Sequence, residues 1–149
     1  MAALSISSNK KQQETMSEVP AWSLTVTDLE DLPPLLGRSD SQKNAYRTAL
    51  IYMNRYAVTE KKYPKLNQMT KEHVEGDCME DYLQDYGGWF ARERILTKQK
   101  TFLATDSKVI SFGLAKEILR HKFKGHDLWK RDETSWWTEM RRDFKKESD

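Results

Sequence analysis

Apolar residues recur with helical spacing in several parts of the chain. In the segment Thr105–Phe123 they stand three, four and seven residues apart, as one buried stripe of a helix requires. A second stripe runs over about Ser41–Thr59, with Ser39 or Ser41 as a suitable N-cap. Further helices are predicted after the capping residue Thr70 and over about Asp132–Lys145. The stripe of the Thr105–Phe123 segment consists of Val109, Ile110, Phe112, Gly113, Ile118, Leu119 and Phe123.

The helix predicted to begin after Thr70 contains the single cysteine of the chain and a pair of adjacent glycines. Its spacing turns Val74, Cys78 and Tyr82 inward, so Cys78 is expected to be a small buried side chain. The pair Gly87-Gly88 weakens a helix. Two readings stay open: the helix ends at the glycines, or it bends and continues through the aromatic residues that follow them.

The chain of 149 residues and 17.5 kDa has the size of one domain with a tail. No strand pattern of useful length and no internal repeat occurs in the sequence. The predicted fold class is therefore all-α, a small bundle of about four helices with a disordered N-terminal leader. Residues 1–37 are assigned to that leader and an apolar arm, and residues 38–149 to the helical domain. Pro33 and Pro34 prevent a helix from running through the arm.

The cysteine content and the apolar runs of the sequence bear on where in the cell the protein is expected. The single cysteine, Cys78, excludes a disulfide within one chain and favours an intracellular, reducing location, without separating nucleus from cytoplasm. The sequence has no secretory signal, and no apolar run approaches the roughly 18 residues that cross a bilayer. A soluble protein without membrane contact is expected.

Charge is segregated along the chain. Residues 38–66 carry seven bases and two acids, residues 67–90 one base and six acids, and residues 91–131 eleven bases and four acids. If folding brings the two basic blocks onto one surface, they form a basic face. An ordinary lysine-rich surface is the simpler alternative. Lys and Arg would bind phosphates and Ser would donate to phosphates or bases. The candidate nucleic-acid contacts are Arg92, Arg94, Lys98, Lys100, Ser107, Lys108, Ser111, Lys116, Arg120 and Lys124.

The residues that catalysis or metal binding would need do not form a recognised pattern. The three histidines and one cysteine have no zinc-site spacing, and no phosphate loop, dinucleotide motif or nucleophile elbow occurs. The carboxylates of Glu72–Asp85 spread around a helix as a solvated surface does. The sequence therefore predicts a protein that is not an enzyme and that binds no metal and no small-molecule cofactor.

Three segments in order, SQKNAYRTALIYMNRYA, YLQDYGGWFARERI and TDSKVISFGLAKEILRHKF, resemble the N-terminal core-binding domain of tyrosine recombinases, the SAM-like module of phage-type integrases. The resemblance covers about residues 38–145. It implies a bundle of about four helices that clamps duplex DNA, with catalysis supplied by a separate domain or a catalytic partner subunit. The sequence HKFK at 121–124 lacks the arginine of that family's catalytic His-x-x-Arg motif, so a non-catalytic module is implied. The acidic segment Glu72–Asp85 would have to point away from DNA.

A protein-protein adaptor is the alternative function. The segment Trp22–Leu36 is rich in apolar residues and suits an arm that docks a partner. Adjacent helix positions point about 100° apart. One of the neighbours Trp136 and Trp137 is therefore expected to face outward and contact a partner.

Overall fold

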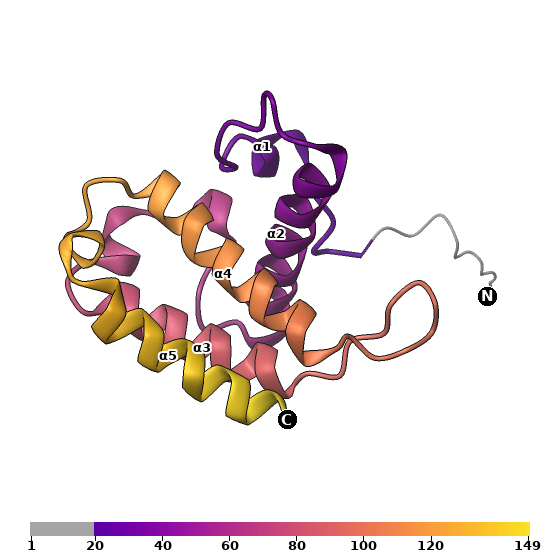
Figure 1. Ribbon diagram of the computed structural model, residues 1–149. Coiled ribbons are helices and arrows are strands. Elements are labelled where there is room, and N and C mark those ends of the chain that lie inside the picture. The colour runs from indigo at the N-terminus through magenta and orange to yellow at the C-terminus, as the bar shows by residue number, and fades with distance from the viewer. Residues whose placement is uncertain (1–19) are drawn as a thin grey trace, which may run out of the picture.

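Residues 20–149, which the computed structural model describes, fold into helices joined by loops, the longest of which projects between α3 and α4 (Figure 1). No β-strand occurs among these residues, so the predicted all-α class is confirmed. The predicted disordered leader lies largely outside the described residues. The helices are α1 (Val26–Leu29), α2 (Asp40–Glu60), α3 (Cys78–Arg92), α4 (Thr105–Lys122) and α5 (Glu133–Ser148), with the short 3-10 helices η1 (Leu66–Gln68), η2 (Lys71–Val74) and η3 (Asp127–Lys130) between them.

Helix α2 begins where its capping signal predicts. The hydroxyl of Ser39 accepts a hydrogen bond from the backbone N–H of Gln42, and the Gln42 side chain accepts one from the backbone N–H of Ser39. This reciprocal pair satisfies two backbone donors that the first turn of a helix leaves without partners. The helix ends at Lys61, whose φ of 59° turns the chain out of the helical path.

The helix predicted after Thr70 is interrupted. Thr70 caps only the single turn of η2, and Gly76 with a φ of 59° breaks the helical path before α3 starts at Cys78. The change in direction turns Cys78 to the surface, so the prediction that it is buried was wrong. Helix α3 then passes through Gly87 and Gly88 to Arg92, which decides between the two readings of the glycine pair.

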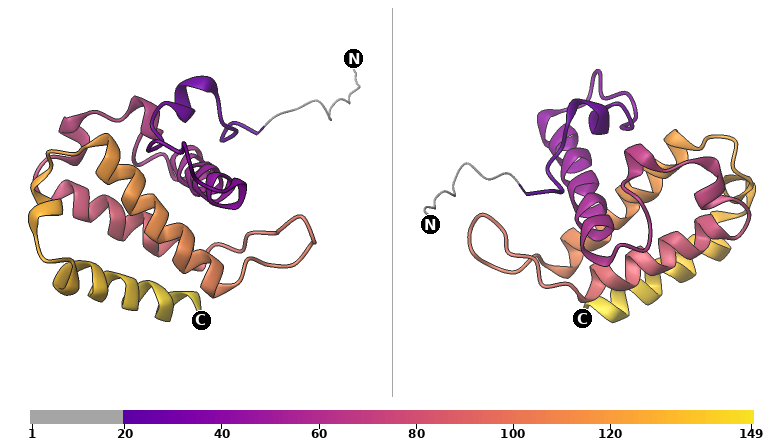
Figure 2. Two further views of the ribbon diagram at one scale, coloured as in Figure 1. Left: turned by 45° about the horizontal axis from the view of Figure 1, so that its top comes forward. Right: turned by 180° about the vertical axis from the view of Figure 1, so that it is seen from behind.

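Helices α3, α4 and α5 pack around Phe112 of α4. A Cβ atom on Gly87 of α3 would lie 2.7 Å from Cζ of Phe112, so only glycine lets the two helices approach this closely. On the other side, the rings of Phe112 and Phe144 of α5 stack with their centroids 4.5 Å apart. Helix α5 runs along α3, while α2 crosses α4 (Figures 1 and 2).

The burial of apolar side chains in the arm and in α5 differs from the prediction. Leu32 of the arm joins the core, whereas Val26 is 78% exposed and Leu36 is 98% exposed. Trp136 and Trp137 are both buried, because the two side chains contact different neighbours in the core. The prediction that one of them faces a partner was therefore wrong.

Candidate nucleic-acid interface

Two predicted contacts on α4 are buried. The side chain of Lys108 is buried, and its Nζ donates hydrogen bonds to the carbonyl oxygens of Ala91 at 3.0 Å and Glu93 at 2.7 Å. Burial lowers the pKa of this ammonium group below its ordinary value. Ser111 is also buried. Both residues were predicted to contact nucleic acid. The prediction for Lys108 was wrong, because its ammonium group is turned inward and bonded to two carbonyl groups. Ser111 is 7% exposed and reaches the surface only at the wall of a hollow between α2 and α4.

Two further cations of α4 are neutralised by carboxylates. The Nζ of Lys116 lies 2.7 Å from Oε1 of Glu133 and 3.2 Å from Oε2 of Glu117, and its side chain is only 7% exposed. Arg120 forms ion pairs with the same two carboxylates. The prediction of a basic α4 face at these positions was wrong, because the charges are already paired within the bundle. The hydrogen bond from Lys116 is the main reason that the pKa of Glu133 falls below its ordinary value.

Arg92 and Lys124 are exposed but lie apart from each other. Arg92 ends α3 and forms an ion pair with Glu147 of α5, with 2.6 Å between Nη1 and Oε1. Lys124 follows the other end of α4 and lines a hollow with Lys71 and His126. These two predicted contacts therefore do not share a surface with the remaining ones.

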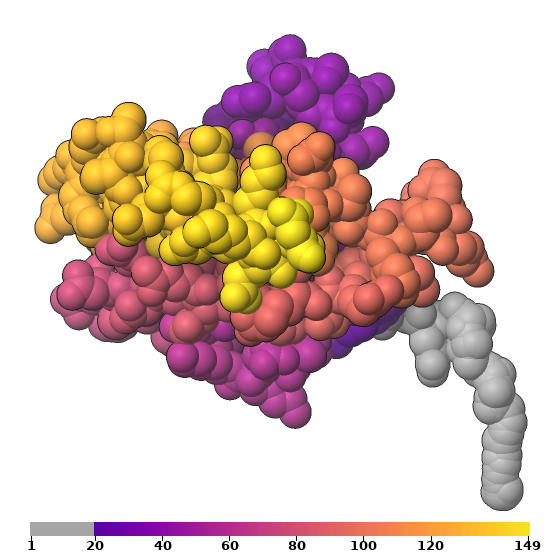
Figure 3. Space-filling model, turned by 60° about the horizontal axis from the view of Figure 1, so that its bottom comes forward, coloured from indigo at the N-terminus to yellow at the C-terminus, as the bar shows by residue number. Residues whose placement is uncertain are grey.

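The other basic residues predicted between α3 and α4 lie on a β-hairpin-like loop, called here the hairpin (residues 94–103). The backbone N–H of Thr97 donates to the carbonyl of Thr101 at 2.7 Å, and that of Leu103 donates to Ile95 at 2.7 Å. The loop stands out from the helical body (Figures 1 and 3). Sequence reasoning predicted an excess of bases in residues 91–131 and did not predict the hairpin. The exposed hairpin side chains include Arg94, Leu96, Lys98, Lys100 and Phe102.

Hairpin and α2 bring the two basic blocks together. Lys98 of the hairpin and Arg47 of α2 line one hollow, together with Asn44 and Thr48 of α2 and Trp22 of the arm. No acidic residue lines it. The hollow therefore combines cations with amide, hydroxyl and aromatic groups. Such groups can bind phosphates, base edges and base faces of a nucleic acid.

A second hollow lies beside the first, between α2 and α4. Asn44 and Thr48 line both hollows, and Ser107 at the start of α4 belongs to the second one. Ile110, predicted to be part of the buried stripe of α4, is 63% exposed and lines this hollow. Of the predicted α4 contacts, Ser107 is exposed at this hollow, and the largely buried Ser111 also lines it.

We call the combined region the hairpin–α2 surface. Sequence reasoning missed its α2 members, although the excess of bases in residues 38–66 contained the signal. Four further exposed cations on α5 were also missed, and none of them forms an ion pair within residues 20–149: Arg141, Arg142, Lys145 and Lys146. The hairpin–α2 surface is defined by residues that line the hollows, Trp22, Asn44, Arg47, Thr48, Lys98 and Ser107, together with two exposed cations of the hairpin that do not line them, Arg94 and Lys100.

No protein-family model, curated protein or solved structure matches this chain. The resemblance to the recombinase core-binding domain consequently stays a prediction. Within residues 20–149 no group of three or more His, Cys, Asp or Glu side chains is placed to hold a metal ion. None of the helices in this part of the chain has the length and apolar character needed to cross a membrane.

Proposed function

We propose that this protein binds duplex DNA through the hairpin–α2 surface. The observation that carries the proposal is the meeting of Arg47 and Lys98, which come from separate basic blocks, in one hollow without acidic residues. Lys100 adds a further exposed cation on the same hairpin. Duplex DNA carries dense negative charge, and each neutralised phosphate releases counterions, so clustered cations bind it more strongly than scattered ones.

Polar groups next to the cations extend the proposed contact. Asn44, Thr48 and Ser107 line the two hollows and can form hydrogen bonds with phosphates or base edges. This arrangement agrees with what the resemblance to a DNA-clamping recombinase module implies. We propose no catalytic role for the described residues.

A salt titration of duplex binding tests the proposal. If about five phosphates are neutralised, affinity should fall by roughly 500-fold between 50 and 200 mM salt. The triple variant Arg47→Ala/Lys98→Ala/Lys100→Ala should bind more weakly and reduce the slope of log affinity against log salt by about 3. Fluorescence anisotropy with a labelled duplex measures both quantities.

A matched variant controls for the loss of three charges. Lys71→Ala/Lys124→Ala/Lys130→Ala removes three exposed lysines that lie outside the hairpin–α2 surface. We expect it to retain most of the affinity and the salt slope. Equal losses of DNA affinity in the two triple variants would contradict the proposal, because they would show non-specific attraction of DNA to a cationic protein. No DNA binding at 50 mM salt would also contradict it.

The apolar arm supports a second candidate function, binding of a partner protein. Val26 and Leu36 are exposed in an arm that Leu32 anchors to the core. A partner protein should then co-purify with the chain even after nuclease treatment, and the double variant Val26→Ser/Leu36→Ser should abolish this co-purification. Its DNA affinity should stay unchanged, which separates the two functions.

A further inference from the structure

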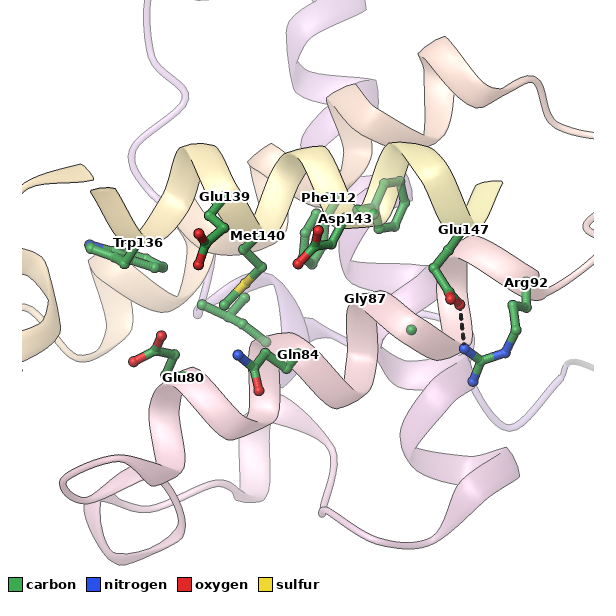
Figure 4. A pocket seen from close by; sticks show the side chains of 13 residues that line it. Glu80, Gln84, Gly87, Arg92, Phe112, Trp136, Glu139, Met140, Asp143 and Glu147 are labelled. Carbon is green, nitrogen blue, oxygen red and sulfur yellow. Dashed lines mark hydrogen bonds and ion pairs between the residues drawn. The ribbon is translucent and has the colours of Figure 1, made fainter. Parts of the chain in front are cut away.

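A groove of about 290 Å³ lies between α3 and α5 (Figure 4). Its floor is apolar, because the side chains of Leu83, Phe112, Met140 and Phe144 line it. Gly87 and Gly88 place no side chain on the α3 wall at this point, which keeps the groove open. Met140 and Phe144 keep 8% and 3% of their surface exposed there, whereas Leu83 and Phe112 lie beneath them with none. The groove therefore offers a narrow apolar strip to a long side chain of a partner.

The rim of the groove is acidic. Glu139 and Asp143 of α5 stand one helical turn apart, and their carboxylates are directed towards the gap in which Glu80 and Gln84 of α3 also lie (Figure 4). Glu147 lies one turn further along α5 and completes this row of carboxylates.

Two of these four carboxylates already have partners. Glu147 pairs with Arg92 at 2.6 Å, and Glu80 pairs with Arg131 at 2.8 Å. Glu139 and Asp143 form no ion pair within residues 20–149. The groove therefore combines an apolar floor with two carboxylates that are available to a ligand.

We propose that the α3–α5 groove docks a basic segment of a partner protein, in which two arginine or lysine side chains lie across the floor and reach Glu139 and Asp143. Long basic side chains have apolar stems and charged ends, so one side chain can satisfy both parts of the groove. The two carboxylates are about 6 Å apart along the α5 axis. That spacing matches cations at positions i and i+4 of a partner helix.

Charge excludes nucleic acid from this groove and separates it from the proposed DNA contact. Phosphates would be repelled by Glu139 and Asp143, whereas a guanidinium group can donate two parallel hydrogen bonds to the two oxygens of one carboxylate. The hairpin–α2 surface shares no residue with the groove. The inference therefore goes beyond DNA binding and can fail or succeed independently of it.

A synthetic peptide probes the groove directly. The probe is a fluorescein-labelled alanine-leucine helix with two arginines at positions i and i+4, and anisotropy reports its binding to the full chain at about 50 mM salt. The variant Glu139→Gln/Asp143→Asn keeps the shape of the rim and removes its charge. We expect it to weaken binding about tenfold, because two partly exposed ion pairs together contribute on that scale. A peptide with glutamine in place of both arginines should bind as weakly to the unsubstituted chain.

Two control variants and one variant that fills the groove make the result specific. Glu60→Gln/Asp81→Asn removes two carboxylates that do not line the groove, and its affinity should stay within about twofold of the unsubstituted chain. Gly88→Leu fills the groove and leaves both rim charges in place, so it should reduce binding even if the charge variant unfolds. Arg47→Ala/Lys98→Ala/Lys100→Ala should bind the peptide normally, which distinguishes this proposal from the one on DNA.

Three outcomes would overturn the proposal. The first is unchanged peptide affinity in both Glu139→Gln/Asp143→Asn and Gly88→Leu. The second is an equal loss in Glu60→Gln/Asp81→Asn, which would show attraction to overall negative charge. The third is a dimer in sedimentation that dissociates on Glu139→Gln/Asp143→Asn, because the groove would then hold a second copy of this chain.

Discussion

Replacing Glu133 with glutamine tests whether the α4 cations serve the fold. Glu133 opens α5 and accepts a hydrogen bond from Lys116 of α4 at 2.7 Å, while Arg120 pairs with its second oxygen. Glutamine has the same shape and keeps one oxygen acceptor, but it carries no charge. The variant therefore leaves Lys116, whose side chain is 7% exposed, with Glu117 at 3.2 Å as its remaining anionic partner.

The expected loss of unfolding free energy follows from this geometry. Removing one member of a fully buried ion pair costs about 3–5 kcal/mol, because the other charge stays buried without a partner. Two features reduce that figure here: the Glu133 side chain is 35% exposed, and Glu117 still contacts Lys116. We expect Glu133→Gln to lower the free energy of unfolding by about 1–2 kcal/mol at pH 7.

The same network gives a pH dependence with a definite sign. The pKa of Glu133 in the folded protein lies below its ordinary value of 4.5, so the unfolded chain takes up the proton first as pH falls. The stabilisation by Glu133 is complete above pH 4.5 and is lost as pH falls through the lower folded pKa. The difference in unfolding free energy between the unsubstituted chain and Glu133→Gln should therefore shrink below pH 4.5.

Urea denaturation followed by circular dichroism at several pH values measures these differences. The double variant Lys116→Met/Glu133→Gln is the control, since replacing a buried ion pair by apolar groups is often neutral. It should recover most of the stability that Glu133→Gln loses. The reasoning is refuted if Glu133→Gln costs less than about 0.5 kcal/mol, or if the double variant is less stable than Glu133→Gln. DNA affinity should be unchanged in all three chains, because Lys116 does not reach the surface.

Three further predictions concern the fold. Gly87→Ala should cost about 1–3 kcal/mol because its methyl group would overlap Phe112, whereas Gly88→Ala should stabilise by up to about 1 kcal/mol; equal effects in urea denaturation would contradict this packing. Ser39→Ala should cost about 1 kcal/mol by removing the α2 cap, and an unchanged thermal midpoint would argue against it. Lys108→Met removes two hydrogen bonds to carbonyl groups at the base of the hairpin, so hydrogen exchange should accelerate in the hairpin amides but not in α2.

The four long helices could be predicted from the sequence because their signals are local. Ser39 stands directly before the apolar stripe of α2, and the spacing of three and four residues identifies the core side of α4. The break before α3 was missed because Gly76 was not recognised as a positive-φ position. A helix continued through that residue would have turned Cys78 inward, whereas the observed restart leaves it at the surface.

The burial of the two α4 lysines, Lys108 and Lys116, could be predicted from the sequence, but their partners could not. Lys108, Phe112 and Lys116 are four residues apart, so all three lie on one face of the helix. Since Phe112 is in the core, this spacing already indicated that the two lysines point inward. Their partners come from distant parts of the chain, the end of α3 and the carboxylate of Glu133. A count of bases by segment cannot show such pairing.

The available charges, rather than the total charges, therefore bear on function. Once the ion pairs within residues 20–149 are removed from the count, Lys98 and Arg47 remain at the hairpin–α2 surface and Glu139 and Asp143 at the groove. Among the other unpaired charges are the four exposed cations of α5, Arg141, Arg142, Lys145 and Lys146. A polyanion and a basic peptide would each be attracted to one of these surfaces and repelled by the other. Because the two surfaces share no residue, the two proposals together predict that DNA bound at the hairpin–α2 surface leaves the groove accessible to a basic peptide.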